Sequence, residues 1–207
     1  MNKLDLTKKY KQYYTAKSQP ELIHLEEITY LSLEGQGDPS GEEYAANISA
    51  LYSVAYALKF LCKASGNDFV VARLEGQWWF DETRYAAVSM DDAPVKIPRA
   101  QWHYRMLIRM PGLVAPSQVS EAVKQVMEKK KIALAGKVKR FTLPATQAVQ
   151  MLHTGPFNKE PETLKVMLQF IQEHQLSRNG VHHEIYLSDF RKTAADKLKT
   201  ILREPVK

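Results

Sequence analysis

A glutamate in the run "VHHEIYLSDFRKT" is the first candidate for chemistry, because Glu184 places a full charge among β-branched and aromatic residues that favour a strand. Alternation along a strand puts Ile185 and Leu187 on one face and Glu184 on the other. His182 and Tyr186 share the face of Glu184. We predict that Ile185 and Leu187 pack against helices, so that Glu184 faces away from those helices, toward water or a cleft. In a cleft, the carboxylate would act as a general base or as the counter-ion of a cation.

Large aromatic residues lie on two other segments that the sequence predicts to be neighbouring strands: Trp78, Trp79, Trp102 and Tyr104. These rings are too many for one thin core that faces helices, so we predict that some of them line a pocket together with Tyr186. An aromatic cavity that holds one carboxylate suits flat or cationic organic molecules. Two structural alternatives remain for Glu184, namely a solvated strand face and an ion pair with Arg73 or Arg105.

Histidine and cysteine side chains do not have the arrangement of a metal site. His182 and His183 are adjacent in a predicted strand and point to opposite faces, so they cannot easily share one ion with His153. Cys62 is the only cysteine and lies in a predicted helix with a broad apolar surface, which favours a small buried hydrophobe over a nucleophile. We therefore predict neither a metal site nor an organic cofactor.

Composition indicates one large domain or two small repeats around a substantial core, because 44% of the 207 residues are hydrophobic. The formal net charge is +6, and the basic residues gather between Lys3 and Lys17, between Lys129 and Arg140, and in the tail after Arg191. A weak affinity for nucleic acid stays an alternative. No helix-turn-helix, zinc-finger or RNP pattern accompanies the charge, so we predict solvated basic ends and no specific nucleic-acid partner.

The sequence predicts no attachment to a membrane. No apolar run approaches the roughly 20 residues of a membrane-spanning helix, and the start of the chain is polar and lysine-rich. A single cysteine fits a reducing compartment, so the predicted location is the cytoplasm. The oligomeric state stays open.

Residues 1–20 are predicted to form a flexible or loosely docked N-terminal arm, and residues 21–207 a single domain that includes a basic C-terminal tail. Hydrophobic periodicity predicts strands within 21–37, 67–74, 101–111 and 182–188, two strands around Pro144, and helices over 41–66, 116–131 and 161–174. Gly76 is expected to break or bulge its strand before Trp78, and the stretch from Asp81 to Pro98 is expected to be a loop with at most a short turn of structure. The tail after Asp189 is predicted to form a short basic helix around residues 194–202, stopped before Pro205.

An internal echo indicates a repeat. The segments "YLSLEGQGDPSGEEY" and "AVQMLHTGPFNKEPET" both run from a strand through a Gly and Pro turn to an acidic helix start. Each segment is followed by an amphipathic helix and another strand. Two such units would place their helices against one face of an antiparallel sheet, which predicts the α+β class.

Four motifs together resemble the GyrI-like small-molecule-binding family: "LEGQWW", "HTGPFNKEPETL", "HHEIYLSDFRKT" and "KLKTILREPVK". The resemblance covers the chain from about Pro20 to Val206 and is closest to a stand-alone branch that includes cyclopropanoid cyclopropyl hydrolases. It implies a pseudo-symmetric pair of βαββ repeats, with helices on one face of an antiparallel sheet and a ligand cleft on the other. The chain departs from the family pattern at Phe190, where proline is usual, and at Ala194 and Ala195, where a Pro-Glu helix start is usual.

The resemblance also implies a site. Family members use an acidic residue of the "HHEIYLSD" strand in the cleft, which corresponds to Glu184, and the hydrolase branch holds DNA-alkylating substrates in an aromatic cage. Trp78, Trp102 and Tyr186 are the first candidates for that cage, and the other candidates for ligand binding are Trp79 and Tyr104.

Three functions remain as alternatives. The first is the capture of an aromatic or cationic xenobiotic for detoxification, with hydrolysis of cyclopropane-type compounds by water that Glu184 orients or deprotonates. The second is sequestration or sensing of a small molecule without catalysis. The third is a module that interacts with gyrase or another macromolecule, which would present an exposed patch in place of an aromatic pocket.

Overall fold

This computed structural model describes residues 3–89 and 91–207. Its strands are β1 (Leu4–Asp5), β2 (Glu21–Leu25), β3 (Ile28–Gln36), β4 (Phe69–Val70), β5 (Leu74–Trp79), β6 (His103–Arg109), β7 (Lys139–Leu143), β8 (Thr146–Thr154), β9 (His182–Tyr186) and β10 (Lys199–Val206). The α-helices are α1 (Leu6–Lys9), α2 (Glu42–Ala64), α3 (Ala93–Lys96), α4 (Pro116–Lys130) and α5 (Glu160–Glu173). Short 3-10 turns are η1 (Arg99–Gln101), η2 (Ala133–Lys137), η3 (Phe157–Lys159) and η4 (Ala195–Lys197). Residues 1–2 of the predicted arm lie outside the described residues.

The main sheet is antiparallel, with eight strands in the order β2-β8-β10-β9-β5-β6-β3-β7. The order is symmetric about the central pair of β9 and β5. The units β3-α2-β5-β6 and β8-α5-β9-β10 occupy equivalent places on the two sides. The α+β class, the antiparallel sheet and the pair of βαββ units are therefore confirmed.

Strand exchange ties the two units together. β2 precedes the first unit in the chain but pairs with β8 of the second, while β7 precedes the second unit but pairs with β3 of the first. Neither unit can complete its half of the sheet without a strand from the other side of the chain. The exchange joins the two repeats in one sheet.

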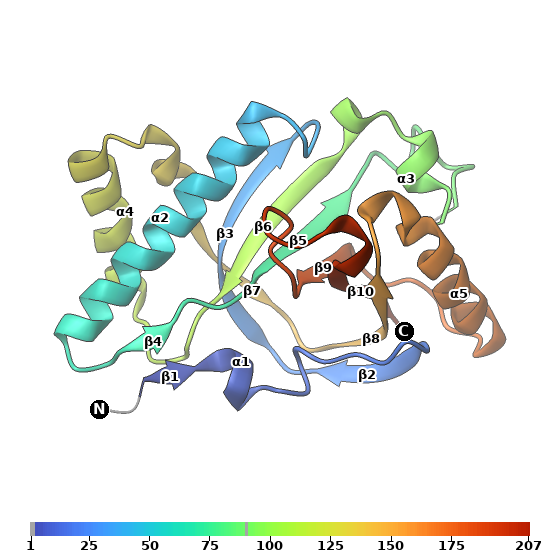
Figure 1. The fold of residues 1–207 in the computed structure, drawn as a ribbon, viewed down its shortest axis with the longest axis horizontal. Helices are drawn as coiled ribbons and strands as arrows, with labels where there is room; N and C mark the ends of the chain where they lie inside the picture. The colour runs from blue at the N-terminus through green and yellow to red at the C-terminus, as the bar shows by residue number, and fades with distance from the viewer. Residues whose placement is uncertain (1–2, 90) are drawn as a thin grey trace.

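The long helices cover two separate parts of one sheet face. Helix α2 carries Leu51, Val54 and Leu58 at steps of three and four, so these side chains share one face of the helix and pack with Leu31 and Met106 of the sheet. Helix α4 adds to the same core. Helix α5 packs on the other half, and Figure 1 shows α2 and α4 at the left and α5 at the right of the central strands. The middle of this face, over β5 and β9, lies between α2 and α5.

Helix α2 is, among the described residues, the one helix long and apolar enough to cross a membrane by length and composition alone. It has 23 residues, and much of it is core: Ala50, Leu51, Val54 and Leu58 are buried against the sheet and α4. Its apolar surface is explained by this packing. The cytoplasmic location stays a prediction.

The opposite face of the sheet is covered by the N-terminal segment. Tyr13 and Tyr14 are buried there in a core that also contains Leu25, Ile185 and Ile201. The prediction of a flexible or loosely docked arm is therefore wrong for the described part of the arm. The boundary at residue 20 stays a prediction.

The predicted faces of β9 are reversed. Ile185 packs in the core under the N-terminal segment, and Leu187 packs against the same core. Glu184 is opposite Leu202 in the register, and Leu202 packs with α5, so Glu184 faces the helices. The prediction that Glu184 and its cleft face away from the helices is wrong, because the covering of the second face by residues 10–16 was not apparent from the sequence.

The predicted basic helix at residues 194–202 is also wrong. Only the turn η4 forms there, and Lys199–Val206 is the strand β10, hydrogen-bonded between β8 and β9. Both faces of β10 are covered, so Ile201 and Leu202 are equally buried and period-two alternation disappears. Arg203 and Glu204, which gave the tail its charged appearance, are fully buried and hydrogen-bonded.

Gly76 does not break its strand, which corrects a further prediction. β5 runs from Leu74 to Trp79 and pairs through Gly76 with both β6 and β9. A Cβ atom at residue 76 would lie 2.8 Å from the hydroxyl oxygen of Tyr186 and 2.9 Å from Nε1 of Trp78. Glycine is therefore required there to let these two side chains meet.

Candidate functional site

Glu184 lies at the centre of the sheet, on β9, opposite Gly76 of β5 and Leu202 of β10. The residue is 9% exposed, so the alternative of a solvated strand face is wrong. The two arginines considered as its partners are engaged elsewhere. Arg105 binds Glu34 and Gln77, and Arg73 donates to the backbone carbonyl of Leu187.

The actual partner of Glu184 is a histidine of the same strand. His182 Nε2 lies 3.3 Å from Glu184 Oε1, and His182 Nδ1 is hydrogen-bonded to Glu204 on β10. Burial alone would lower the pKa of His182, but the negative charges of Glu204 and Glu184 outweigh it and raise the pKa to about 10. His182 is therefore a cation at neutral pH, held between two carboxylates.

Arg178 completes the charge balance of this group. Its Nε lies 3.2 Å from Glu204 Oε2, so Glu204 receives both a guanidinium and an imidazolium. Glu204 is fully buried, and a buried carboxylate needs such partners. The chain Arg178, Glu204, His182 and Glu184 contains two cations and two anions.

Aromatic rings lie on the same sheet face as Glu184. The indole N–H of Trp78 donates to the Tyr186 hydroxyl over 3.0 Å. The Trp78 ring centroid lies 5.8 Å from that of Tyr44 on α2 and 6.5 Å from that of Trp102. These distances are typical of packed aromatic pairs.

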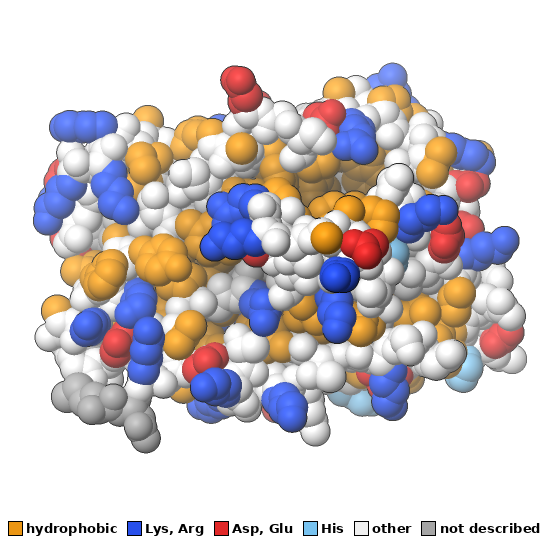
Figure 2. Space-filling view, in the orientation of Figure 1, with side chains coloured by type: hydrophobic (Ala, Val, Ile, Leu, Met, Phe, Trp, Pro, Cys, Tyr) orange, Lys and Arg blue, Asp and Glu red, His pale blue; other side chains and the backbone are white. Residues whose placement is uncertain are grey.

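Phe157 extends the ring cluster from the second unit. Its centroid lies 6.1 Å from that of Tyr186 in an edge-to-face arrangement. Figure 2 shows hydrophobic side chains lining a hollow on this face, between the region of α2 and that of α5. The cluster thus contains rings from both units, which meet at the centre of the sheet.

Two tyrosines of the cluster keep their protons at neutral pH. Burial, and then the negative charge of Glu184, raise the pKa of Tyr186 well above its usual range. The same two causes, in the same order, raise the pKa of Tyr44. Both hydroxyls are therefore neutral hydrogen-bonding groups next to the carboxylate.

The five predicted ligand-binding residues do not form one group. Trp78, Trp102 and Tyr186 come together on the face of Glu184. Tyr104 is fully buried behind them, where it packs edge-on against Tyr44 and accepts a hydrogen bond from Asn47. Tyr104 therefore supports the rings from below.

Trp79 lies on the opposite sheet face, which corrects its predicted place in the same cleft. Its ring stacks on His103 at 5.7 Å, and the guanidinium of Arg105 lies 5.4 Å from its centroid. Trp78 and Trp79 are adjacent in one strand, so alternation separates them. This separation could have been predicted from the sequence, because the two residues are consecutive in a predicted strand.

Several residues of this region were not among the sequence-based candidates: Tyr44, Phe157, Glu160 and Glu204. Tyr44 and Glu160 lie in the first turns of α2 and α5, the two acidic helix starts that the internal echo marks. That echo was the only available signal for them. Glu204 was hidden by the incorrect assignment of the tail as a helix.

Metal ligands are not gathered in the described ranges, 3–89 and 91–207, where no group of three or more His, Cys, Asp or Glu side chains is placed to hold an ion. His182 and His183 do point to opposite faces, as predicted. His183 binds Glu75 at 2.9 Å under the N-terminal segment, on the sheet face opposite to the partners of His182.

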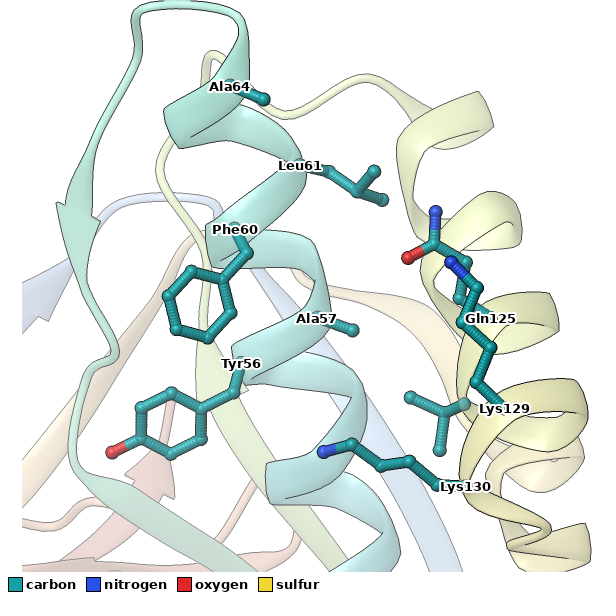
Figure 3. Close-up of a pocket in the computed structure, with 9 residues that line it drawn as sticks. Tyr56, Ala57, Phe60, Leu61, Ala64, Gln125, Lys129 and Lys130 are labelled. Atoms are coloured by element: carbon teal, nitrogen blue, oxygen red, sulfur yellow. The ribbon is translucent and has the colours of Figure 1, made fainter.

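A separate groove of about 350 Å³ lies between α2 and α4. Figure 3 shows Tyr56 and Phe60 of α2 on one side and Lys129 and Lys130 of α4 on the other. It is an open apolar surface with a basic border, and it shares no residue with the surroundings of Glu184.

Comparison with known proteins identifies the family. Residues 18–207 match the GyrI-like small molecule binding domain. The chain belongs to the GyrI-like small-molecule-binding family. The family match begins three residues before the predicted domain start and includes β10.

Solved structures resemble the chain over 91% or more of its length. An uncharacterized conserved protein from Listeria innocua is 35% identical with a TM-score of 0.87, and the match covers 99% of this chain and 100% of that one. A hydrolase from Listeria innocua is 35% identical with a TM-score of 0.84, with the same coverage. The C-terminal domain of EcmrR is 13% identical with a TM-score of 0.56, covering 91% of this chain and 97% of that one, and shares the fold. Among curated proteins, no sequence matches this chain.

Proposed function

We propose that this GyrI-like protein binds flat aromatic small molecules against the ring cluster of Trp78, Trp102, Tyr186, Tyr44 and Phe157, with Glu184 as the polar group that orients the guest. The observation that carries the proposal is the position of Glu184, a nearly buried carboxylate at the centre of the sheet with rings from both units beside it. Aromatic walls supply contact area with little loss of side-chain freedom, and one fixed polar group supplies orientation.

For reactive guests we propose hydrolysis. Glu184 takes a proton from a water molecule whose oxygen attacks an electrophilic cyclopropane carbon. The attacked ring C–C bond breaks, and its electron pair passes into the conjugated carbonyl group of the guest, which takes up a proton. The rings hold the guest so that its carbon faces the water, which lowers the entropic part of the barrier. Support comes from the 35% identical Listeria innocua protein described as a hydrolase.

The ion pair with His182 has two consequences for this proposal. It fixes the orientation of the Glu184 carboxylate, which favours a defined position for the attacking water. It also engages Glu184 Oε1 with a donor, so that this oxygen is not free to accept the proton of water. The second consequence favours the alternative function, sequestration of aromatic guests without turnover.

The Glu184→Gln variant separates the two functions. We expect hydrolysis of a cyclopropane-bearing alkylator, followed as product formation over time, to fall by about a hundredfold or more, because the amide cannot accept the proton of water. Glu173→Gln, an exposed change on α5, is the matched control and should hydrolyse at the wild-type rate. Absence of turnover in the wild type, with intact binding, would support sequestration. Equal turnover in both variants and the wild type would remove Glu184 from the chemistry.

A further inference from the structure

Glu160 is a buried carboxyl group that the proposed function does not use. It is the first residue of α5 and is 7% exposed. Its Oε1 atom has no hydrogen-bond partner among the residues that the structure describes. Leaving a buried polar atom unpaired destabilises the folded state, so the fold alone gives no reason for a glutamate at this position.

The groups that face Glu160 explain its charge state. Burial, and then repulsion by Glu184, raise the pKa of Glu160 well above its usual range, while the His182 cation acts in the opposite direction. On its own helix, Glu162 is exposed and paired with Lys159. Glu160 is therefore a neutral carboxylic acid at neutral pH.

The other titratable groups near this point are already engaged. His182 is shared between Glu184 and Glu204, and Arg178 binds Glu204. His153 on β8 is bonded to Thr163 through Nδ1. Tyr44 and Tyr186 are neutral hydroxyls. The two nearby cations are balanced by the carboxylates of Glu184 and Glu204, and Glu160 is the carboxyl that has no cation of its own.

A guest molecule can supply the missing cation. We propose that Glu160 is a specificity-determining residue for aromatic cations: a positively charged guest bound beside Glu184 ionises Glu160, and binding releases one proton to the solvent. The inference rests on the proposed function, because it places the guest in the same ring cluster. The net charge of the site does not change, because one positive charge enters with the guest and one leaves with the proton.

Proton release gives the site a pH-dependent preference. Below the titration range of Glu160, each bound cation displaces one proton, so the affinity for cations rises by up to about tenfold per pH unit. A neutral aromatic guest leaves Glu160 protonated, so its affinity stays flat with pH over the same range. The protein would therefore prefer cations more strongly as the pH rises.

Isothermal titration calorimetry with two guests of equal shape tests the inference. N-methylquinolinium carries a positive charge, and 1-methylnaphthalene is its neutral counterpart. Titrations at pH 7 in phosphate and in Tris, whose ionisation enthalpies differ, count the protons released. We expect release of about one proton for the cation and none for the neutral guest.

Two variants assign the proton to its residue. Glu160→Gln keeps the shape of the neutral acid, so it should bind 1-methylnaphthalene as the wild type does, bind N-methylquinolinium about tenfold more weakly and release no proton. Its fold is checked by thermal unfolding, where replacement of an uncharged buried acid by an amide should leave the transition intact. Glu162→Gln, two residues away and exposed, should keep the proton release of the wild type.

The outcomes separate failure of the inference from failure of the proposed function. If neither guest binds the wild type, the ring cluster is not an aromatic site and both proposals fail. If both guests bind and no proton is released by the wild type, the inference is wrong and the proposed function stands. Proton release that persists in Glu160→Gln would assign the proton to another group, such as His182, and would also overturn the inference.

Discussion

Gly76 is the residue on which the geometry of the ring cluster depends most directly. A methyl group there would collide with the Tyr186 hydroxyl at 2.8 Å and with Trp78 Nε1 at 2.9 Å, so Tyr186 and Trp78 would have to separate. We expect Gly76→Ala to lower the free energy of unfolding by about 1–3 kcal/mol in urea denaturation. Gly112→Ala is the control, since a Cβ atom there meets nothing within 4 Å, and should change stability by less than about 0.5 kcal/mol. Equal stability of the two variants would contradict the packing described.

The protonation of His182 predicts that the stability of the protein depends on pH. Its pKa is raised from 6.5 to about 10 in the folded protein. A raised pKa means that the folded state holds the proton more tightly, so the stabilisation is complete below about pH 6.5 and is lost as the pH rises through 10. We expect the free energy of unfolding to fall by up to about 5 kcal/mol across this range because of His182, at about 1.4 kcal/mol per unit of its pKa shift.

The measurement is a series of urea denaturation curves between pH 6 and 10 for the wild type and for His182→Gln. The amide cannot carry the charge, so the variant should lose less stability over the range than the wild type. Parallel curves for the two proteins would show that His182 does not titrate with folding. His24→Gln, a change at an exposed histidine of β2, should behave as the wild type.

At the residue scale, the sequence predicted only part of the site. Glu184 was identifiable because a charge in a strand of β-branched and aromatic residues is unusual. Glu160 and Glu204 were not, because their roles depend on α5 and β10 meeting β9 in space. Trp79 was assigned wrongly to the cleft although alternation with Trp78 already separated them.

At the scale of elements, the N-terminal segment acts as the cover of the second sheet face. The Tyr13 hydroxyl donates to Glu75 Oε2 over 2.6 Å, and the same oxygen is bound by His183. We expect Tyr13→Phe to lower the free energy of unfolding by about 1–3 kcal/mol, because Glu75 is fully buried and loses a donor. Tyr56→Phe, at a tyrosine that is 46% exposed, should change stability by less than about 0.5 kcal/mol. Indistinguishable stabilities for the two variants would mean that the N-terminal segment is loosely docked after all.

Long helices and most strands were predictable, whereas β10 and the N-terminal segment were not. Helices α2, α4 and α5 carry apolar residues at steps of three and four and begin near a glycine or a proline. Their local sequence is therefore sufficient to predict them. β10 is buried on both faces and contains Arg203 and Glu204, whose burial depends on partners from distant segments: Gln150 for the arginine, and Arg178 and His182 for the glutamate. Local periodicity does not contain that information.

At the scale of the whole molecule, the site follows from the symmetry of the fold. The two units meet at β5 and β9, the two central strands, and each unit places one long helix beside that junction. Trp78 comes from the first unit, and Tyr186 and Glu184 come from the second. A guest that contacts these rings would therefore touch both units at once. One unit alone would supply only part of the candidate site, and the two units together supply all of it.

The central claim is that aromatic guests bind on the face of Glu184 and nowhere else on the sheet. The most direct test is calorimetric titration of 1-methylnaphthalene into the wild type and into two matched variants, Trp78→Ala and Trp79→Ala, each confirmed as folded by circular dichroism. The two tryptophans are neighbours in one strand but lie on opposite faces, so they share sequence context and differ in position. We predict that Trp78→Ala weakens binding by about tenfold or more and that Trp79→Ala changes it by less than about twofold. Equal affinities for Trp78→Ala and the wild type, or a larger loss in Trp79→Ala, would contradict the account.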